Sequence, residues 1–377
     1  MRIAILSSFP PHALPALAGM GPPKGHYATW LPHLAVEFAR YSTELDLHWI
    51  GLVPEPAMAG SHSWSGQSFH FLPTQLRGRA SSLYRADRRA LQARLDELKP
   101  DLVHGWGNED VYGLAAALSG FRNLVGVQGL ISYYVQRTRM HPRDWFQALI
   151  EGFVLRKAGH LVAESPWACR MASRHSGGRR VHRVEYGVQN LFQETRWTPD
   201  PGAPRAVFCG SADARKGIGD LVRAFRSPTL AQAQLRIVGD DSGREAARWK
   251  AASPPNVEWV GRRPIDECAR LVGEGWCSVM PTRCDTGPMA VKEARVIGLP
   301  VISSPFSGAA DYIEEGANGF LVRPGDIEAL TDRLALLLSN LELCRRMGGH
   351  RHAEQRIEFS AAATANGFRA LYQECVA

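Results

Sequence analysis

The chain has 377 residues, of which 45% are hydrophobic and 21% are charged, a composition typical of globular proteins that excludes disordered and collagen-like chains. At roughly 150 residues per domain, this length predicts two domains. The formal net charge of +7 favours an acidic partner such as a phosphate, a nucleic acid or an anionic lipid, although scattered surface cations would give the same sum.

The start of the chain predicts a buried strand over residues 3–6. This apolar run is interrupted by Ser7, Ser8 and Pro10 before it could form a signal-peptide core. No window reaches the roughly 18 apolar residues that cross a bilayer, so we expect a cytoplasmic protein, with the inner face of the membrane as the alternative position. The seven cysteines contain no C-x-x-C pair, which predicts reduced thiols and neither a disulfide framework nor a zinc site.

The first half alternates short Val/Ile/Leu-rich runs with amphipathic stretches. Runs without polar alternation, separated by more than a dozen residues, indicate buried parallel strands joined by helices. The predicted strands are 3–6, 47–53, 102–104, 124–127 and 161–163, and the clearest helices are 31–40 and 83–98, the second ending at Pro100.

The same alternation restarts after residues 191–204, where Thr, Pro, Asp and Gly accumulate and predict a linker. Strands are predicted at 206–209, 235–238, 257–260, 278–280, 301–303 and 320–322. The sequence therefore predicts two doubly wound α/β, Rossmann-like domains, residues 1–190 and 205–359. Such folds bind ligands at the carboxyl ends of their strands, here expected in a cleft between the domains.

A loop of small residues with two cations follows the strand predicted at 206–209. Arg215 and Lys216 lie on it, directly before a helix predicted at 218–225. A cation beside a helix N-terminus suits a phosphate. No Ser or Thr follows Lys216 as a P-loop would require, so an ordinary solvated turn remains the alternative.

A second loop, residues 280–288, leads into another predicted helix. Pro288 suits the first helical turn, with Thr286 or Gly287 as the cap. The free amides of Met289 and Ala290 could then face a pyrophosphate.

Asp285 on this loop and Glu293 on the helix are two carboxylates eight residues apart. Each can accept two hydroxyl hydrogen bonds, so the pair suits a polyol such as a sugar and a ribose. Taken alone, the two residues are better explained as a capping Asp and an exposed Glu.

Four further segments follow in close order: residues 298–304, 307–313, 316–322 and 324–326. Together with Glu293, this order resembles the donor-binding domain of the GT-B glycosyltransferases of family 4, which carry the glycosyl transferases group 1 domain. The resemblance covers about residues 207–338, with Lys216 at the K-G position and Gly239 at the V-G-D position. It is weaker over residues 1–190, where the loop 21–26 and residues 186–188 are altered.

The resemblance implies transfer of a sugar from a nucleotide-sugar to an acceptor hydroxyl, with retained anomeric configuration and no tightly bound metal or other cofactor. It assigns Lys216 to the donor diphosphate, Glu293 to the ribose hydroxyls and Asp285 to the sugar. The other implied donor-binding positions are Ser211, Arg215, Gly239, Arg262 near the base, and the amides of Gly287, Met289 and Ala290. On the acceptor or sugar side it implies Gly25, His26 and Gln128.

Four residues depart from the family pattern. Asp285 stands where Glu is usual, Ser211 where Arg is usual, Pro288 where Gly is usual and Gln128 where His is frequent. Pro288 removes one amide donor, and Gln128 cannot titrate. We therefore keep open a nucleotide-sugar-binding GT-B protein without transferase activity.

Residues 133–157 combine basic and aromatic side chains. Such a helix could lie on an anionic membrane and approach a lipid-linked acceptor, or be an ordinary amphipathic helix. The acceptor would belong to polysaccharide, lipopolysaccharide or glycolipid synthesis.

By family analogy the last helix, within 360–377, crosses back to the first domain. Asp240-Asp241 could suggest a metal site, but they occupy the V-G-D position. The alternative of a nucleic-acid-binding protein rests on the net charge alone.

Overall fold

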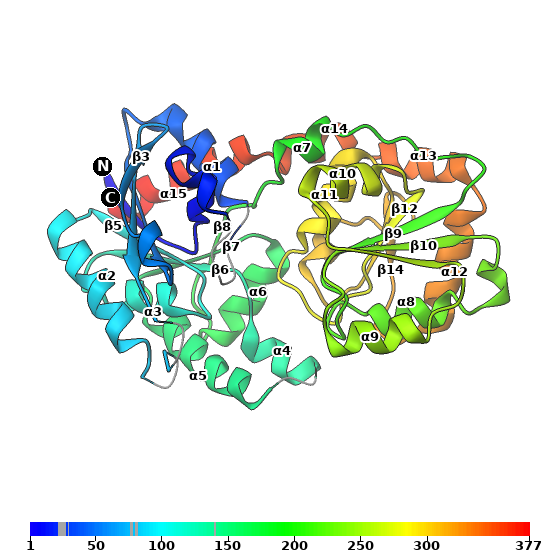
Figure 1. Cartoon of the computed structure of the whole chain (residues 1–377), viewed down its shortest axis with the longest axis horizontal. Helices are drawn as coiled ribbons and strands as arrows, with labels where there is room; N and C mark the ends of the chain where they lie inside the picture. The colour runs from blue at the N-terminus through cyan, green and yellow to red at the C-terminus, as the bar shows by residue number, and fades with distance from the viewer. Residues whose placement is uncertain (22–27, 29, 76–77, 80–81, 139–140) are drawn as a thin grey trace. The chain divides into compact units, whose positions relative to one another are not determined.

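The computed structural model describes residues 1–21, 28, 30–75, 78–79, 82–138 and 141–377, and it divides into two compact units. The first unit comprises Met1–Val135, Met140–Tyr186 and Ala361–Ala377, and the second comprises Gln136–Arg139 and Gly187–Ser360. Each unit is a Rossmann-like α/β domain, which confirms the predicted fold class (Figure 1).

The first unit is built on an eight-stranded sheet with the order β3-β4-β2-β1-β5-β6-β7-β8. All five predicted strands occur in it and pair in parallel. The strands are β1 (Arg2–Leu6), β2 (Asp46–Val53), β3 (Gly60–Trp64), β4 (Gln67–Pro73), β5 (Leu102–Trp106), β6 (Asn123–Val127), β7 (His160–Ala163) and β8 (His182–Arg183).

Two strands that the sequence analysis missed form an antiparallel hairpin at the edge of this sheet. β3 pairs with β4, and the turn between them places Ser65 and Gly66 at φ 51° and 72°. Two successive residues with positive φ match the twist of a tight hairpin. The Ser-Gly pair was therefore an available signal for this turn.

Seven α-helices cover the sheet within the described part of the first unit. They are α1 (Leu31–Phe38), α2 (Arg85–Leu98), α3 (Val111–Leu118), α4 (Ile131–Arg137), α5 (Pro142–Lys157), α6 (Pro166–His175) and α15 (Ala361–Val376). Helix α2 ends where predicted, because Lys99 adopts φ 49° directly before Pro100. The segment 133–157, treated as one helix in the sequence analysis, includes the end of α4 and the whole of α5.

Helix α15 is part of the first unit although it lies at the far end of the chain. The Tyr372 hydroxyl contacts Nδ1 of His104 on β5 at 2.8 Å, and its ring stacks on Phe38 of α1 at 6.2 Å between centroids. Both Tyr372 and His104 are fully buried. The first unit therefore needs residues from both ends of the sequence to complete its core.

The second unit has a six-stranded, entirely parallel sheet with the order β11-β10-β9-β12-β13-β14. All six predicted strands occur. They are β9 (Arg205–Cys209), β10 (Gln234–Val238), β11 (Val257–Gly261), β12 (Cys277–Val279), β13 (Val301–Ser303) and β14 (Gly319–Leu321).

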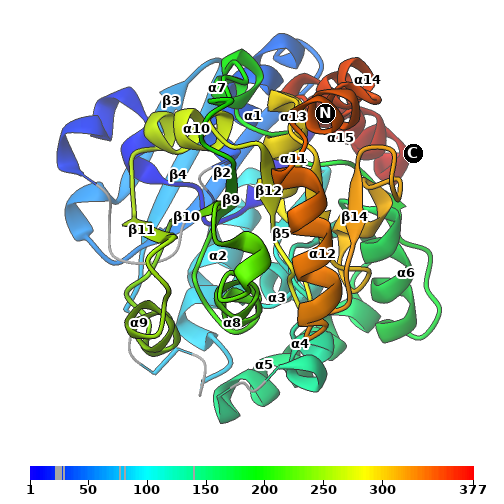
Figure 2. The same ribbon diagram turned by 90° about the vertical axis from the view of Figure 1, so that its right-hand side faces the viewer.

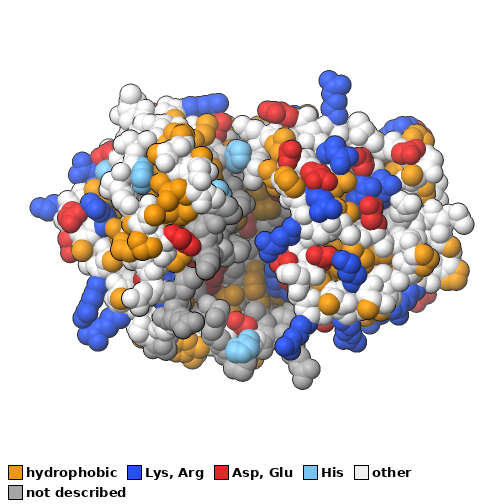
Figure 3. Space-filling view, viewed as in Figure 1, with side chains coloured by type: hydrophobic (Ala, Val, Ile, Leu, Met, Phe, Trp, Pro, Cys, Tyr) orange, Lys and Arg blue, Asp and Glu red, His pale blue; other side chains and the backbone are white. Residues whose placement is uncertain are grey.

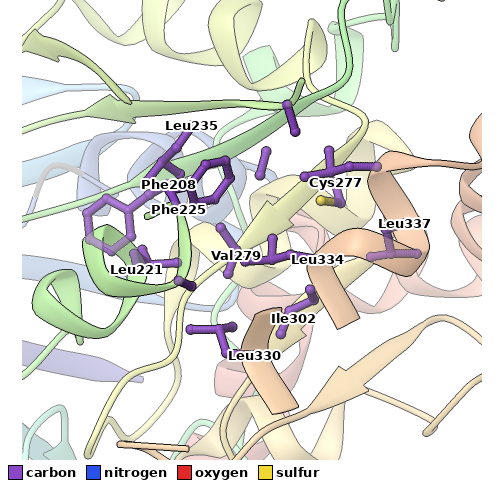
Figure 4. Close-up of a cluster of buried hydrophobic side chains, with 14 of the residues drawn as sticks. Phe208, Leu221, Phe225, Leu235, Cys277, Val279, Ile302, Leu330, Leu334 and Leu337 are labelled. Atoms are coloured by element: carbon purple, nitrogen blue, oxygen red, sulfur yellow. The ribbon is translucent and has the colours of Figure 1, made fainter. Parts of the chain in front are cut away.

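Helices cover both faces of this sheet (Figure 2). One hydrophobic cluster joins strand residues such as Phe208 and Leu235 to Leu221 of α8 and Leu334 of α12 (Figure 4). A second cluster joins Val207 and other strand residues to α10 and α11. The helices are α7 (Asn190–Glu194), α8 (Ile218–Ala224), α9 (Arg244–Ala251), α10 (Ile265–Gly273), α11 (Met289–Ile297), α12 (Ile327–Leu338), α13 (Leu341–Gly349) and α14 (His352–Glu358).

Residues 191–204, expected to be a linker, are part of the second unit. Helix α7 occupies the start of this segment. The Trp197 indole N–H donates to the Gly275 carbonyl at 2.7 Å, and the Trp276 indole N–H donates to the Asp200 carbonyl at 2.8 Å. The polar composition resembles a linker, but the tryptophan contacts hold the segment against the domain.

Candidate functional site

Two cations and a carboxylate meet at the carboxyl edge of the second sheet. Arg215 and Lys216 lie on the loop after β9, and Asp285 lies on the loop after the neighbouring strand β12. The Lys216 ammonium donates to Oδ2 of Asp285, and Nη1 of Arg215 donates to the same oxygen at 3.2 Å. The structure thus brings together three residues that the sequence predicted as one site.

The charges of this cluster do not cancel. Burial alone would raise the pKa of Asp285, but the charges of Lys216 and Arg215 and a hydrogen bond from Lys216 lower it below its ordinary value. Asp285 therefore remains a carboxylate at neutral pH. Two cations and one carboxylate leave a net charge of +1, which suits an anionic ligand.

Glu293, on α11, is the second carboxylate of this region, and no described residue donates a hydrogen bond to it. Burial and the charge of Cys268 raise its pKa to about 7, against the opposing effects of Lys216 and Lys292. A partly buried carboxylate without an internal donor is available to accept hydroxyl groups from a ligand.

Helix α11 starts one residue later than the sequence predicted. Pro288 is its N-cap, with φ −65° and ψ 109°, and neither Thr286 nor Gly287 caps it. The extended ψ of Pro288 keeps it outside the helix, so Met289 is the first helical residue. Because no side chain caps this end, the amides of the first turn, including those of Met289 and Ala290, are available to a ligand. The Gly287 amide instead hydrogen-bonds to the Asp285 carboxylate.

The loops after β9 and β10 pack backbone to backbone through two glycines. Gly239 has φ 129°, and a Cβ atom there would lie 2.2 Å from the carbonyl oxygen of Gly210. Only glycine fits this approach. The same contact places Ser211, which is exposed, beside the loop that carries Lys216.

None of the described contacts of Arg262 involves the cluster of Lys216, Arg215 and Asp285. Its guanidinium pairs with Asp240 at 2.8 Å, and its side chain is 77% exposed. Hydrogen bonds from Arg262 and Ser242 lower the pKa of Asp240, and Asp241 pairs with Lys250 at 3.1 Å. Both aspartates thus face cations of the protein, and no cluster of potential metal ligands occurs among the described residues.

In the first unit, Gln128 follows β6 at the carboxyl edge of the sheet. Its backbone N–H donates to Oδ1 of Asn108 at 3.2 Å, and Nδ2 of Asn108 donates to the Gly129 carbonyl at 2.8 Å. Asn108 therefore ties the loop after β5 to the loop after β6. The other two predicted acceptor-side residues, Gly25 and His26, lie outside the described residues.

Glu109 is a candidate that the sequence analysis missed. It follows β5, and its Oε2 atom is buried without a hydrogen-bond partner among the described residues. Its Oε1 atom is close to Gly129, where a Cβ would lie 3.4 Å away. Burial, together with the charges of Glu151 and Asp110, raises its pKa to about 8. The Glu-Asp pair on the loop after a predicted strand was the available signal.

Helix α5 carries a row of exposed apolar side chains. Trp145, Leu149 and Phe153 are spaced by one helical turn and are 55%, 73% and 46% exposed. Leu149 and Phe153 line an apolar groove of about 320 Å³ with Leu118 of α3. Within the described ranges, the structure contains no helix with the length and hydropathy of a membrane span.

Surface charges on the face shown in Figure 3 are mixed. Over the described part of the second unit, Lys and Arg side chains alternate with Asp and Glu and form no continuous basic stripe on this face. Nucleic-acid binding depends on such a stripe, so Figure 3 does not support the alternative of a nucleic-acid-binding protein.

Comparison with known proteins locates the strongest similarity in the second unit. Residues 203–340 match the family model "Glycosyl transferases group 1". A GDP-mannose-dependent alpha-mannosyltransferase of Mycobacterium tuberculosis is 30% identical over 221 residues, which cover 55% of this chain and 54% of that protein. The chain matches between about a third and about half of the length of its curated relatives.

Solved structures match over nearly the whole chain. Sucrose-phosphate synthase from Thermosynechococcus elongatus superposes with a TM-score of 0.80 at 20% identity, covering 99% of this chain and 98% of that one. HepE from Anabaena, in complex with UDP and glucose, has a TM-score of 0.71 at 15% identity, covering 99% of this chain and all of that one. Residues 203–340 are therefore similar to the glycosyl transferases group 1 family, and the chain has the two-domain fold of the GT-B glycosyltransferases.

Proposed function

We propose that the protein is a retaining glycosyltransferase of family 4, which moves a sugar from a nucleotide-sugar to an acceptor hydroxyl in polysaccharide, lipopolysaccharide or glycolipid synthesis. The observation that carries the proposal is the site on the second sheet. There the net positive Lys216–Arg215–Asp285 cluster and the unpaired Glu293 carboxylate accompany the uncapped start of α11. The mannosyltransferase relative and the UDP-bound HepE structure support a nucleotide-sugar donor.

Each group has a distinct task in this proposal. As the bond from the anomeric carbon to the diphosphate breaks, negative charge develops on the diphosphate, and Lys216 and Arg215 stabilise it. Asp285 holds both cations and accepts sugar hydroxyls, and Glu293 accepts the ribose hydroxyls. The first-turn amides of α11 contribute further donors. Gly239 supports the phosphate-binding loop, and Arg262 approaches the base from the exposed rim.

The first unit supplies the acceptor side of the reaction. Gln128, with Gly25 and His26, is the proposed contact to the acceptor or the transferred sugar. Glu109 adds a carboxyl group beside Gln128, and its raised pKa keeps it protonated at neutral pH. A protonated carboxyl can donate one hydrogen bond and accept another, which suits a sugar hydroxyl.

A panel of nucleotide-sugars tests the donor site. UDP-, GDP- and ADP-sugars are added in turn to the wild type, to Glu293→Ala and to Glu328→Ala, and thermal unfolding is followed. Glu328 is an exposed first-turn glutamate of α12 and serves as the control. We expect one donor class to stabilise the wild type and the control, but not Glu293→Ala.

Three other outcomes have defined meanings. If no nucleotide-sugar stabilises the wild type, the proposed function is wrong. If stabilisation is undiminished in Glu293→Ala, the ribose assignment is wrong. Donor binding without sugar transfer or donor hydrolysis, measured by release of the nucleoside diphosphate, would favour the binding protein without transferase activity.

We also propose that α5 rests on an anionic membrane, where a lipid-linked acceptor would be found. Its exposed apolar row is accompanied by Arg156 and Lys157 in the last turn, a pattern typical of helices that lie in the membrane interface. Leu149→Glu should reduce cosedimentation with vesicles of phosphatidylcholine and phosphatidylglycerol. Ile357→Glu, at an equally exposed leucine-sized residue of α14 (73%), should not, and equal binding by both variants would contradict the proposal.

A further inference from the structure

The two loops that carry the proposed donor site are joined through Arg283. This residue lies on the loop after β12, two positions before Asp285. Its backbone N–H donates to the carbonyl of Arg215 at 2.8 Å, and its Nη1 donates to the carbonyl of Ala214 at 3.1 Å. Both carbonyls belong to the loop after β9, directly before Lys216. Arg283 therefore holds the backbone from which the two cations of the site extend.

The guanidinium of Arg283 is held in turn by a buried carboxylate, Asp220 of α8. Nη2 of Arg283 lies 3.1 Å from Oδ1 and 3.0 Å from Oδ2 of Asp220, whose side chain is 1% exposed. Asp220 also accepts hydrogen bonds from Nη2 of Arg223 and, at 3.0 Å, from the backbone N–H of Gly325, which follows β14. Because three donors compensate its buried charge, Asp220 is a firm anchor for Arg283.

Two further contacts hold the same loops together. The buried hydroxyl of Thr282 lies 3.1 Å from the Arg215 carbonyl oxygen, which it shares with the Arg283 N–H. Gly217 has φ 80°, and a Cβ atom there would lie 2.3 Å from the carbonyl oxygen of Pro281. The two loops therefore pack directly on each other, and a displacement of one loop is transmitted to the other.

The packing of these loops determines whether the two cations of the site act together. Lys216 and Arg215 extend from the loop after β9, and both donate to the same oxygen of Asp285 on the opposite loop. A relative displacement of the loops separates the cations from Asp285 and from each other. A misplacement of about 1 Å in a reacting site can lower a rate about 100-fold.

We propose that Arg283 and Asp220 are positioning residues, which hold the loop after β9 so that Lys216 and Arg215 reach the donor diphosphate together. Neither Arg283 nor Asp220 contacts the donor in this proposal. Its first part, that the pair keeps Lys216 on Asp285, concerns the structure of the site alone. Its second part, an effect on sugar transfer, rests on the proposed function.

The alternative is that Arg283 is itself a third cation for the diphosphate. Against this, its Nη1 and Nη2 atoms both donate to protein acceptors, and Asp220 balances its charge. The variant Arg283→Lys separates the two roles. Lysine keeps the positive charge but lacks the planar fork that spans the Ala214 carbonyl and Asp220.

Labelling of lysines in the full chain tests the first part without any ligand. The protein is treated briefly with dilute acetic anhydride, and the acetylated fraction of each lysine is measured by mass spectrometry. The wild-type Lys216 ammonium is paired with Asp285, so it should react slowly. We expect Lys216 to react severalfold faster in Arg283→Ala and in Asp220→Asn, because the loops are no longer held together.

Two other lysines and one matched variant control this experiment. Lys250 is exposed and reports the activity of the reagent, whereas Lys292 is fully buried and reports unfolding. The labelling of both should be the same in all variants. Arg236→Ala removes an arginine that is 10% exposed and pairs with Glu258 at 2.8 Å in the same unit, and it should leave the labelling of Lys216 unchanged.

The kinetics of sugar transfer test the second part. We expect kcat/KM to fall about tenfold in Arg283→Ala, to remain low in Arg283→Lys and to stay unchanged in Arg236→Ala. A double variant with Lys216→Ala shows whether Arg283 acts through the cations. Without Lys216, the loss caused by Arg283→Ala should shrink to about threefold, because only Arg215 remains to be positioned.

Each outcome has a defined meaning. Unchanged labelling of Lys216 in Arg283→Ala and Asp220→Asn overturns the positioning role. If Lys292 reacts faster in Arg283→Ala, that variant is partly unfolded, and the labelling of Lys216 in Arg283→Lys decides instead.

The kinetic outcomes are decided separately. Recovery of wild-type kcat/KM in Arg283→Lys would assign Arg283 to the donor directly, and an equal loss with and without Lys216 would show that it does not act through that cation; either result overturns the second part. If the wild type binds no nucleotide-sugar in the panel above, the proposed function fails, whereas the positioning role is still decided by the labelling of Lys216.

Discussion

At the carboxyl edges of the two sheets, the pKa values of two acidic side chains are shifted in opposite directions. On the second sheet, Asp285 is held by two cations and its pKa is lowered. On the first sheet, the buried Oε2 of Glu109 has no partner among the described residues, and the pKa of Glu109 is raised to about 8. Similar backbones thus produce a fixed charge on one sheet and a neutral carboxyl group on the other.

In the proposed function, this difference corresponds to two kinds of ligand. A nucleotide-sugar carries permanent negative charge, so a permanently charged cluster suits it. A saccharide acceptor offers hydroxyl groups, and a protonated carboxyl can bind them without the cost of burying a charge. Four substitutions test this difference between the two sheets.

Lys216→Ala should have the largest effect on sugar transfer. It removes the cation that contacts Asp285 most closely and leaves the developing charge of the diphosphate to Arg215. We expect kcat/KM for sugar transfer to fall about 100-fold, as for loss of one electrostatic contact in a transition state. Lys250→Ala removes a lysine that pairs with Asp241 on the same unit and should change kcat/KM little. Similar rates for both variants would place the diphosphate elsewhere.

Glu109→Gln should change the pH dependence of stability of the first unit. The native pKa of about 8 lies above the ordinary 4.5, so the folded form holds a proton that the unfolded form has lost. The free energy of unfolding therefore falls as pH rises from about 4.5 to 8, by up to about 5 kcal/mol in total.

Urea unfolding of wild type and variant at several pH values measures this effect, and the variant should lack that decline. Glu97→Gln, at a glutamate whose side chain is 63% exposed, should retain it. Donor affinity should be unchanged in Glu109→Gln. A tenfold weaker donor affinity would instead assign Glu109 to the donor site.

Glu293→Gln should have an intermediate effect, centred on the donor. We expect about tenfold weaker nucleotide-sugar binding, equal to about 1.4 kcal/mol, because an amide replaces a carboxylate acceptor. The wild-type pKa of about 7 means that the carboxylate is lost as pH falls below 7. Wild-type affinity should therefore decrease between pH 8 and pH 6, while that of the variant stays constant. Calorimetric titration at the two pH values distinguishes these profiles.

Arg262→Ala should have the smallest effect. Its side chain is 77% exposed and already paired with Asp240, and exposed pairs contribute little. A two- to threefold loss of donor affinity is expected in the same titration. A loss of donor affinity of more than tenfold would show that binding of the nucleotide base depends strongly on Arg262 despite the exposure of its side chain.

The sequence predicted most of the parallel strands but missed the hairpin β3–β4 at the edge of the first sheet. All eleven predicted strands are present because buried parallel strands are uninterrupted apolar runs. The hairpin strand β3 was missed because it is a polar edge strand, with His62 between two serines. Residues 191–204 have the composition of a linker, and only the tertiary contacts of Trp197 and Trp276 reveal a packed segment.

The candidate site was also predicted only in part. The contact between Lys216 and Asp285 was predictable from motif order, since both residues follow neighbouring strands at one sheet edge. The properties of Glu109 were not predictable, because they arise from burial where Asn108 joins two loops. The start of α11 was misplaced by one residue, because the ψ of Pro288 depends on its loop and not on residue type.

The position of α15 has a consequence for folding during synthesis. Apart from Gln136–Arg139, the second unit is continuous in sequence, over Gly187–Ser360, whereas the first unit includes Ala361–Ala377. On the ribosome, the domain encoded later can therefore finish folding before the domain encoded first. Until Tyr372 emerges and reaches His104, the nascent first unit would expose the apolar surface that α15 covers, and this interval is when chaperones would have most to bind.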